Sequence, residues 1–326
     1  MSEETTLKQS EEEQTVKSDG LDDGNCEKTS ENTANEKPKR QRVWEIDFLR
    51  GFCVVLMILD HLALLLSEIF GPAWYGWGET FFETADAFTR FCRVWMDSEA
   101  RRVLHPIVLF IFFSISGICC SFSKSNLKRG LLLAGVALLY TLATYGVQTL
   151  VYEDRDVLHT GSVFVTFGVL HFLAFCVLLY ALIQLATRKT KWQKWIVGGI
   201  SLAIIIVVLT LYFCYTPPEN THKIFGIFFP PKDIHGNPAT FYYQGELSPG
   251  DLFSIIPYSA FFFFGAMIGP FIYPSRRSLL KKLDGKWHTP ITFIGRHALI
   301  FYLAHLIVLA GILALAGYAK TGSWGF

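Results

Sequence analysis

The sequence predicts an all-α integral membrane protein, a bundle of about seven transmembrane helices. Two observations predict this fold class. First, 51% of the 326 residues are hydrophobic and the mean hydropathy is positive, whereas soluble proteins scatter their apolar residues among polar ones. Second, the apolar residues gather in runs of about 20, the length at which a helix crosses a hydrocarbon core of ~30 Å.

The chain opens with a polar segment. Residues 1–43 are rich in Glu, Ser, Thr, Asn and Lys and cannot bury enough apolar surface to offset the entropy of ordering. We expect a disordered tail, with no cleaved signal peptide because it lacks an apolar core. Residues 44–326 then form the transmembrane domain. Its predicted helices are 47–66, 105–122, 129–150, 162–186, 195–214, 251–273 and 291–318.

Charged residues separate these runs in order and predict their orientation, since positive residues accumulate in cytoplasmic loops. Basic clusters precede the first helix and follow the second, fourth and sixth, whereas the short loop after the third is acidic. We therefore expect the N-terminus in the cytoplasm and the C-terminus outside. The basic clusters are Lys37, Lys39, Arg40 and Arg42; Lys124, Lys128 and Arg129; Arg188, Lys189, Lys191 and Lys194; and Arg276, Arg277, Lys281, Lys282 and Lys286.

Two outer segments, 67–104 and 215–250, are too long to be simple turns. Their aromatic content, including Trp74, Trp77 and Trp95, favours ordered loops over disorder. Such residues either cover a sugar or form the aromatic belt at the membrane interface. The sequence leaves both interpretations open.

Composition excludes several function classes. Lys and Arg total 29 against 28 Asp and Glu, so no bulk attraction to nucleic acid is expected. Five of the seven cysteines lie in apolar runs, where they read as small buried hydrophobic residues. No His/Cys spacing is typical of a zinc site, so we expect neither a metal nor a disulfide framework.

Ionisable residues inside the membrane are costly, so those in the first helix are candidate functional residues. Asp47 and Arg50 lie near its cytoplasmic end, and Asp60 and His61 near its outer end. Arg50 and His61 share one helix face, roughly 16 Å apart along the axis. An arginine binds phosphate bidentately and a histidine accepts a proton near neutral pH. In the simpler alternative, Asp47 and Arg50 reach the headgroups and His61 caps the helix.

Three further residues lie in later helices. His171 is in the fourth helix, and Arg296 and His305 are in the seventh, with His305 near mid-membrane. A histidine at that depth faces the bundle interior. Both histidines are also explained as structural residues hydrogen-bonded between helices. His105, beside Pro106, is most simply an interfacial residue.

The motifs that carry these residues resemble the bacterial heparan-α-glucosaminide N-acetyltransferase-like family. The opening run Trp44 to Gly51, followed by Met57 to His61, is similar to the start of that family. Later stretches follow in the same order and cover nearly all of the chain after residue 43. They are Ser114 to Gly117, Asn126 to Gly130, Phe167 to Leu173, Asp251 with Pro257 and Gly265, Gly295 to His297, and Tyr302 to His305.

The spacing of an arginine, ten residues and a histidine also resembles the wider membrane acyltransferase type 3 group. This resemblance implies acetyl or acyl transfer from cytoplasmic acyl-CoA to an acceptor on the outer face, with His61 as the base. One feature departs from the lysosomal member, whose key histidine follows the first helix. This chain has no histidine between His61 and His105.

The sequence thus predicts a multi-pass plasma-membrane acyltransferase that moves an acetyl group from acetyl-CoA to an amine or hydroxyl, on a glycan or similar acceptor. His61, with Asp60 beside it, is the predicted catalytic base. Arg50 and Arg296 are the predicted contacts for the CoA phosphates, and Asp47, His171 and His305 are predicted to line the path. The oligomeric state stays open.

Two rival interpretations come from other classes. A transporter or channel would use the histidines as a proton or substrate path, but the sequence has no internal repeat of the kind that transporters show. A non-catalytic membrane partner or glycan receptor would have no donor cavity.

Overall fold

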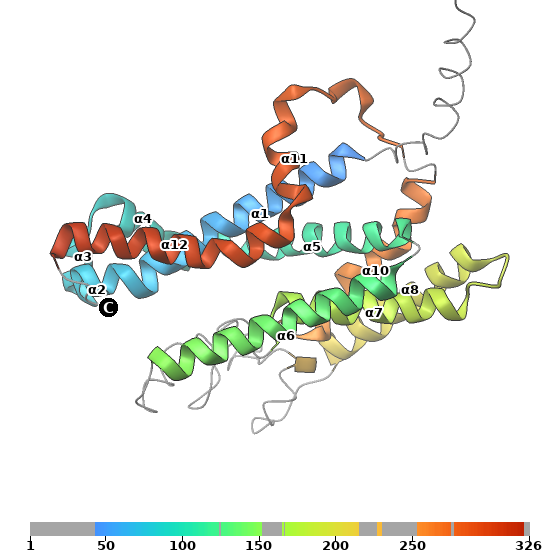
Figure 1. The fold of residues 1–326 in the computed structure, drawn as a ribbon, viewed down its shortest axis with the longest axis horizontal. Helices are drawn as coiled ribbons and strands as arrows, with labels where there is room; N and C mark the ends of the chain where they lie inside the picture. The colour runs from blue at the N-terminus through green and yellow to red at the C-terminus, as the bar shows by residue number, and fades with distance from the viewer. Residues whose placement is uncertain are drawn as a thin grey trace, which may run out of the picture. The chain divides into compact units, whose positions relative to one another are not determined.

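The computed structural model of the chain describes residues 43–123, 125–151, 165, 167–214, 227–229, 253–274 and 277–322 (Figure 1). The regular elements in these ranges are all helical. Seven helices are long and apolar enough to cross a membrane, which confirms the predicted fold class. The predicted disordered tail, residues 1–43, lies outside the described residues except for Val43.

The first span is the longest. It consists of α1 (Trp44–Leu65), a π-helical segment η1 (Leu66–Phe70) and α2 (Gly71–Tyr75). The other spans are α5 (Glu99–Phe122), α6 (Asn126–Val151), α7 (Val169–Ala186), α8 (Gln193–Cys214), α10 (Ile255–Ile272) and α12 (Ala298–Thr321). Shorter helices are α3 (Glu79–Thr84), α4 (Ala87–Asp97), α11 (Thr289–Arg296), and the 3₁₀ turns η3 (Lys281–Leu283) and η4 (Lys286–His288).

Several boundaries differ from the predicted ones because hydrophobicity continues across backbone breaks. The predicted helix 162–186 begins instead at Val169, after Gly168 in an extended conformation. The predicted helix 291–318 is two helices, α11 and α12, separated at His297 with φ −109° and ψ 23°. The predicted helix 251–273 begins at Ile255, and residues 251 and 252 lie outside the described residues.

The predicted outer loop 67–104 is wrong as a loop, because most of it is helical. The side chain of Asp86 caps α4 by accepting hydrogen bonds from the backbone N–H groups of Phe88 and Thr89. The hydroxyl of Tyr75 also donates to this carboxylate. That hydrogen bond first, and then those of the cap, hold the pKa of the Asp86 carboxyl below its usual range. The second predicted outer loop, 215–250, lies outside the described residues except for 227–229.

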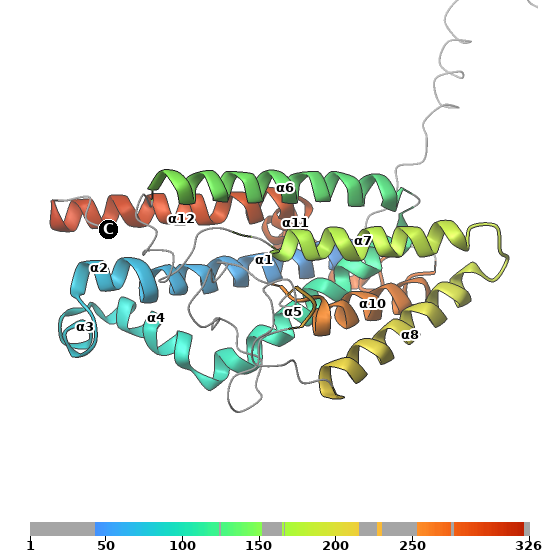
Figure 2. The ribbon, with the colours of Figure 1, turned by 90° about the horizontal axis from the view of Figure 1, so that it is seen from below.

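Close backbone approach holds α5 against α10 (Figure 2). A Cβ on Gly265 would overlap the carbonyl oxygen of Ser114, and a Cβ on Gly117 would overlap that of Phe262. In a bilayer, helices gain little from excluding water and associate through such close packing of small residues. Buried aromatic side chains complete the contact with α7, among them Phe113, Phe172, Phe262 and Phe263.

The first span packs in the same way against two later helices. Glycine against glycine brings α1 onto α11, since a Cβ on Gly51 would overlap the carbonyl oxygen of Ile291 and a Cβ on Gly295 would overlap that of Asp47. Further along the first span, Leu65, Phe70 and Leu313 form a buried cluster with α12. In Figure 1, α12 runs alongside α1, and α11 crosses the beginning of α1.

Substituting Gly265 with Ala should therefore lower the melting temperature of the protein in detergent. The added methyl group meets main-chain atoms that cannot move aside, at a cost of about 1–3 kcal/mol. The matched control is Gly135→Ala on α6, where an added Cβ meets nothing within 4 Å. Equal melting temperatures for the two variants would contradict the proposed close packing.

Candidate active site

The predicted donor-binding residues Arg50, on α1, and Arg296, at the end of α11, lie close together. The Arg50 guanidinium donates to the sulfur of Cys119 at 2.7 Å and lies 3.9 Å from Asp47. Nε of Arg296 lies 3.4 Å from the other oxygen of the same carboxylate. The glycine contact between α1 and α11 brings these two arginines together, because Gly51 follows Arg50 and Gly295 precedes Arg296.

A cavity of about 300 Å³ opens beside these arginines, between α1, α5, α6, α7 and the junction of α11 and α12. Most of its lining is apolar, from residues such as Leu132, Leu173 and Val177. Its polar lining includes Arg50, Arg129, Arg296, Ser116, Cys119 and Tyr302. Such a combination, an apolar wall with a few convergent polar groups, is typical of a ligand site.

The cavity carries an excess of positive charge. Arg50 and Arg296 share the single carboxylate of Asp47. Among the residues that the structure describes, no acidic side chain forms an ion pair with Arg129. Three guanidinium groups around one carboxylate favour an anionic ligand, and guanidinium matches phosphate in geometry.

Sequence reasoning missed Arg129 as a site residue, since it was counted only among the loop charges that set the topology. The predicted helix began at Arg129, whereas α6 begins at Asn126. Arg129 therefore lies in the first helical turn and lines the cavity. Its polar neighbour Asn126 is buried, and its side-chain amide donates hydrogen bonds to the Cys120 carbonyl and to the Gln184 side chain. These bonds fix where that turn begins.

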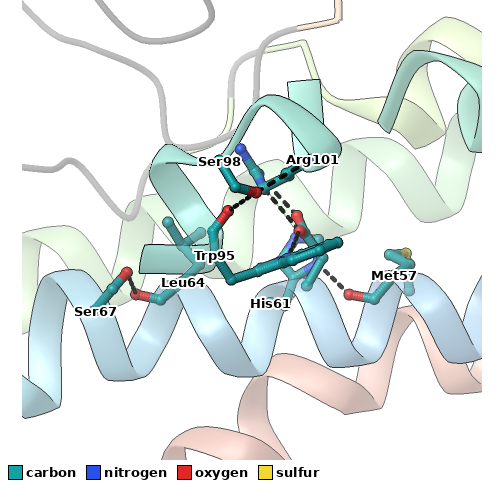
Figure 3. A network of polar contacts seen from close by, with 8 residues as sticks. Met57, His61, Leu64, Ser67, Trp95, Ser98 and Arg101 are labelled. Atoms are coloured by element: carbon teal, nitrogen blue, oxygen red, sulfur yellow. Dashed lines mark hydrogen bonds and ion pairs between the residues drawn. The ribbon is translucent and has the colours of Figure 1, made fainter. Parts of the chain in front are cut away.

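His61 lies eleven residues further along α1, roughly 16 Å from Arg50 at a rise of about 1.5 Å per residue. Its Nδ1 lies 2.8 Å from the carbonyl oxygen of Met57 on the same helix (Figure 3). A carbonyl only accepts, so Nδ1 carries the proton and Nε2 of the neutral ring is a bare acceptor. This tautomer is the one that a general base using Nε2 requires.

Asp60 is next to His61 in sequence, but its side chain contacts Arg101 instead. Its carboxylate forms two hydrogen bonds with Arg101 of α5, at 2.7 and 2.8 Å, and Nε1 of Trp95 lies 3.4 Å away. Because α1 continues as a helix through both positions, adjacent residues point in different directions. Asp60 thus joins α1 to α5 beside His61, and no spacing in the sequence predicts Arg101 as its partner.

His305 on α12 lies against His61. The two ring centroids are 4.8 Å apart and the planes meet at 82°. Nδ1 of His305 lies 2.6 Å from the carbonyl oxygen of Tyr302, whose side chain lines the cavity. The structure therefore brings His61 and His305 together, and Tyr302 links them to the cavity that holds the arginines.

His171 is not part of this arrangement. Its Nδ1 accepts from the backbone N–H of Gly168, and its Nε2 donates to the hydroxyl of Thr141, which donates to the carbonyl of Val165. Both ring nitrogens are satisfied, and the ring does not line the cavity. This geometry matches the structural alternative stated for His171.

No group of three His, Cys, Asp or Glu side chains in the described part of the chain is placed to hold a metal ion. The described residues that converge here therefore offer two kinds of chemistry. Guanidinium groups, which suit an anion, line the cavity, and two imidazole rings, which suit proton exchange, lie about three helical turns away along α1.

Comparison with known proteins identifies the family of the chain. A family model described as heparan-alpha-glucosaminide N-acetyltransferase, catalytic, matches residues 42–307, a range that contains every site residue from Asp47 to His305. Neither the curated proteins nor the solved structures gave a match. The match covers most of the chain and confirms the resemblance seen in its motifs. The chain therefore belongs to the heparan-alpha-glucosaminide N-acetyltransferase catalytic family, a family of membrane acetyltransferases.

Proposed function

We propose that the protein moves an acetyl or other short acyl group from cytoplasmic acyl-CoA to an amine or hydroxyl of an extracytoplasmic glycan or similar acceptor. The observation that carries this proposal is the arginine-lined cavity beside α1, the helix that also carries His61. Family membership supports acetyl transfer. The cavity and the histidines suggest how donor and acceptor are divided between the two ends.

The donor end suits a phosphorylated thioester. Arg50, Arg129 and Arg296 surround one cavity, and each guanidinium is able to form paired hydrogen bonds with a phosphate. The arginines would hold the phosphate groups of CoA, while the apolar lining accepts the uncharged arm that ends in the thioester. A long arm is needed, because Arg50 and His61 are roughly 16 Å apart.

At the other end, His61 would act as the general base. Its bare Nε2 takes the proton of the acceptor amine or hydroxyl as the acceptor attacks the thioester carbonyl. The new bond to the acyl carbon forms, the carbon–sulfur bond breaks, and the CoA thiolate leaves. The proton on His61 then passes to that thiolate, which gives acylated acceptor and CoA thiol.

Asp60 and Arg101 would hold this end in place rather than take part in proton transfer. Their ion pair links α1 to α5 directly beside His61, with side chains about four-fifths buried. A bidentate pair of this kind is more directional than a single contact. It would fix the height at which α1 presents His61 to an acceptor.

Replacing Arg50 with Ala should weaken the binding of acetyl-CoA to purified protein about tenfold or more. A charge-assisted hydrogen bond contributes about 1.5–3 kcal/mol, and about 1.4 kcal/mol corresponds to tenfold in affinity. Isothermal calorimetry in detergent measures this loss. Arg129→Ala carries the same prediction with less structural risk, since its side chain is exposed and has no acidic partner among the described residues.

Arg102→Ala is the matched control, because Arg102 is exposed, pairs with Glu99 and lies outside the cavity. Its affinity for acetyl-CoA should equal that of the wild type. Unchanged binding in folded Arg50→Ala and Arg129→Ala proteins would refute the assignment of the donor site. Absence of binding in the wild type at millimolar acetyl-CoA would favour the transporter interpretation.

Replacing His61 with Ala should leave a folded, membrane-inserted protein that binds acetyl-CoA but does not transfer the acetyl group. General base catalysis typically contributes about 10²–10⁴-fold to the rate. Transfer of radiolabelled acetyl from acetyl-CoA to glucosamine measures the effect. His61→Asn, which retains a donor near the Met57 carbonyl, should lose the same activity. Turnover at the wild-type rate in either variant would contradict the assignment of His61 as the general base.

The proposed direction of transfer requires the N-terminus in the cytoplasm and the C-terminus outside. Epitope tags at the two ends test this in intact cells. The C-terminal tag should bind an impermeant antibody directly, and the N-terminal tag only after permeabilisation. The reverse result would place the basic clusters outside and remove the argument for a cytoplasmic donor.

A further inference from the structure

The pair formed by His61 and His305 has a property that the proposed reaction does not yet use. His305 is only 6% exposed, and its Nε2 is buried with no hydrogen-bond partner among the described residues. A buried polar atom without a partner costs free energy unless a working state supplies one. What lies against this nitrogen therefore bears on function.

Both rings are held in the same tautomer by their own helices. Nδ1 of His61 donates to the carbonyl of Met57, four residues earlier, and Nδ1 of His305 donates to that of Tyr302, three residues earlier. In their neutral forms both Nε2 atoms are bare acceptors. No hydrogen bond joins these two described rings, although their centroids are only 4.8 Å apart. Two bare nitrogens have no proton to share, so this absence is expected of the neutral pair.

The charged groups around the pair leave His305 as the unpaired acceptor in contact with His61. On α1, Asp60 is already bound to Arg101 and approached by Trp95. On α5, His105 lies near the Asp60–Arg101 ion pair and near His61. In the described part of the chain, the ring of His61 contacts the ring of His305, and His305 also contacts the ring of Tyr302.

We propose that His305 is a positioning residue that shares the proton taken up by His61, an inference that rests on the proposed function. The acceptor's N–H or O–H bond breaks and an N–H bond forms at Nε2 of His61. That N–H donates to Nε2 of His305, so the positive charge is spread over two rings. When the CoA thiolate leaves, it takes the proton and both rings return to the neutral state.

The physical reason is the cost of a buried cation. An imidazolium formed between membrane helices is poorly solvated, and the only nearby carboxylate, among the described residues, is already paired with Arg101. A hydrogen bond from the new N–H to an unpaired acceptor offsets part of that cost. It also gives the buried Nε2 of His305 the partner it lacks.

Two substitutions at His305 separate proton sharing from simple support. His305→Asn retains a donor close to the Tyr302 carbonyl and removes the second nitrogen. His305→Gln supplies an amide oxygen or nitrogen near the position of Nε2, but that amide does not take a proton. Both should lower kcat about tenfold to a hundredfold while the KM for acetyl-CoA stays at the wild-type value. The acid limb of the pH–rate profile should move in both variants.

His297→Asn is the matched control. His297 makes the same kind of contact, from Nδ1 to the carbonyl of Phe293, but its side chain is exposed and lies outside the cavity lining. Its kcat and pH profile should match the wild type. Full activity with an unmoved profile in His305→Gln would overturn proton sharing and leave only a hydrogen-bonding role. Unchanged kcat in His305→Asn would overturn the role entirely.

A measurement without turnover keeps this inference separate from the proposed function. In protein labelled with ¹⁵N-histidine, the Nε2 resonances of His61 and His305 should titrate together, and the His61 midpoint should move in His305→Asn. If no acetyl transfer is found but the coupling is present, the proposed function fails and the pair stands. If His61 titrates identically with and without His305, the pair is refuted even in an active enzyme.

Discussion

The contact between α1 and α11 at Gly51 and Gly295 determines how two of the arginines that line the cavity are placed. Helices in a bilayer gain little from excluding water, so their spacing depends on which side chains stand between them. Here no side chain does, and the main chains of the two helices touch. Arg50 and Arg296, each adjacent to one of these glycines, are thereby brought within reach of the same carboxylate, that of Asp47. Two of the three arginines that line the cavity are placed by this approach, and the third, Arg129, comes from α6.

The histidine end depends on a different kind of contact. There α1 is joined to α5 by the bidentate ion pair of Asp60 with Arg101, and it meets α12 through the ring of His305. The arginine cluster and the histidine pair are thus separated along α1, with a distinct set of neighbours at each end. This separation is what a reaction needs when its donor and acceptor approach from opposite sides of a membrane. Of the five residues, only Arg50 and His61 lie on α1; Arg129, Arg296 and His305 reach its two ends from α6, α11 and α12.

Much of this arrangement could be predicted from the sequence, because bilayer thickness fixes helix length. Runs of apolar residues predict the seven spans, and helical spacing predicts that Arg50 and His61 lie on one face of the first span. The breaks at Gly168 and His297 are not predicted because apolar residues are plentiful on both sides of each break. The helical segment after Leu66 was missed because its amphipathic α4 resembles a polar loop, although Asp86 has the character of an N-cap.

The site was predicted less completely than the fold. Which residues share a site depends on contacts between helices far apart in sequence, and no spacing rule reports them. Asp60 was assigned beside His61 in sequence, yet it faces Arg101, 41 residues away. Arg129 looked like a loop charge because its helix starts one turn earlier than expected. His171 satisfies both nitrogens locally, through Gly168 and Thr141, which hydrophobicity alone does not reveal.

The break at His297 has a consequence for how such a protein diversifies. It places Arg296 and His305 on two separate helices, each held to its own end of α1. A structural change caused by a mutation near His305 is therefore not transmitted to the arginines through one rigid helix. In the proposed reaction, this separation lets natural variation or design change the acceptor near His305 while the arginines keep the same donor.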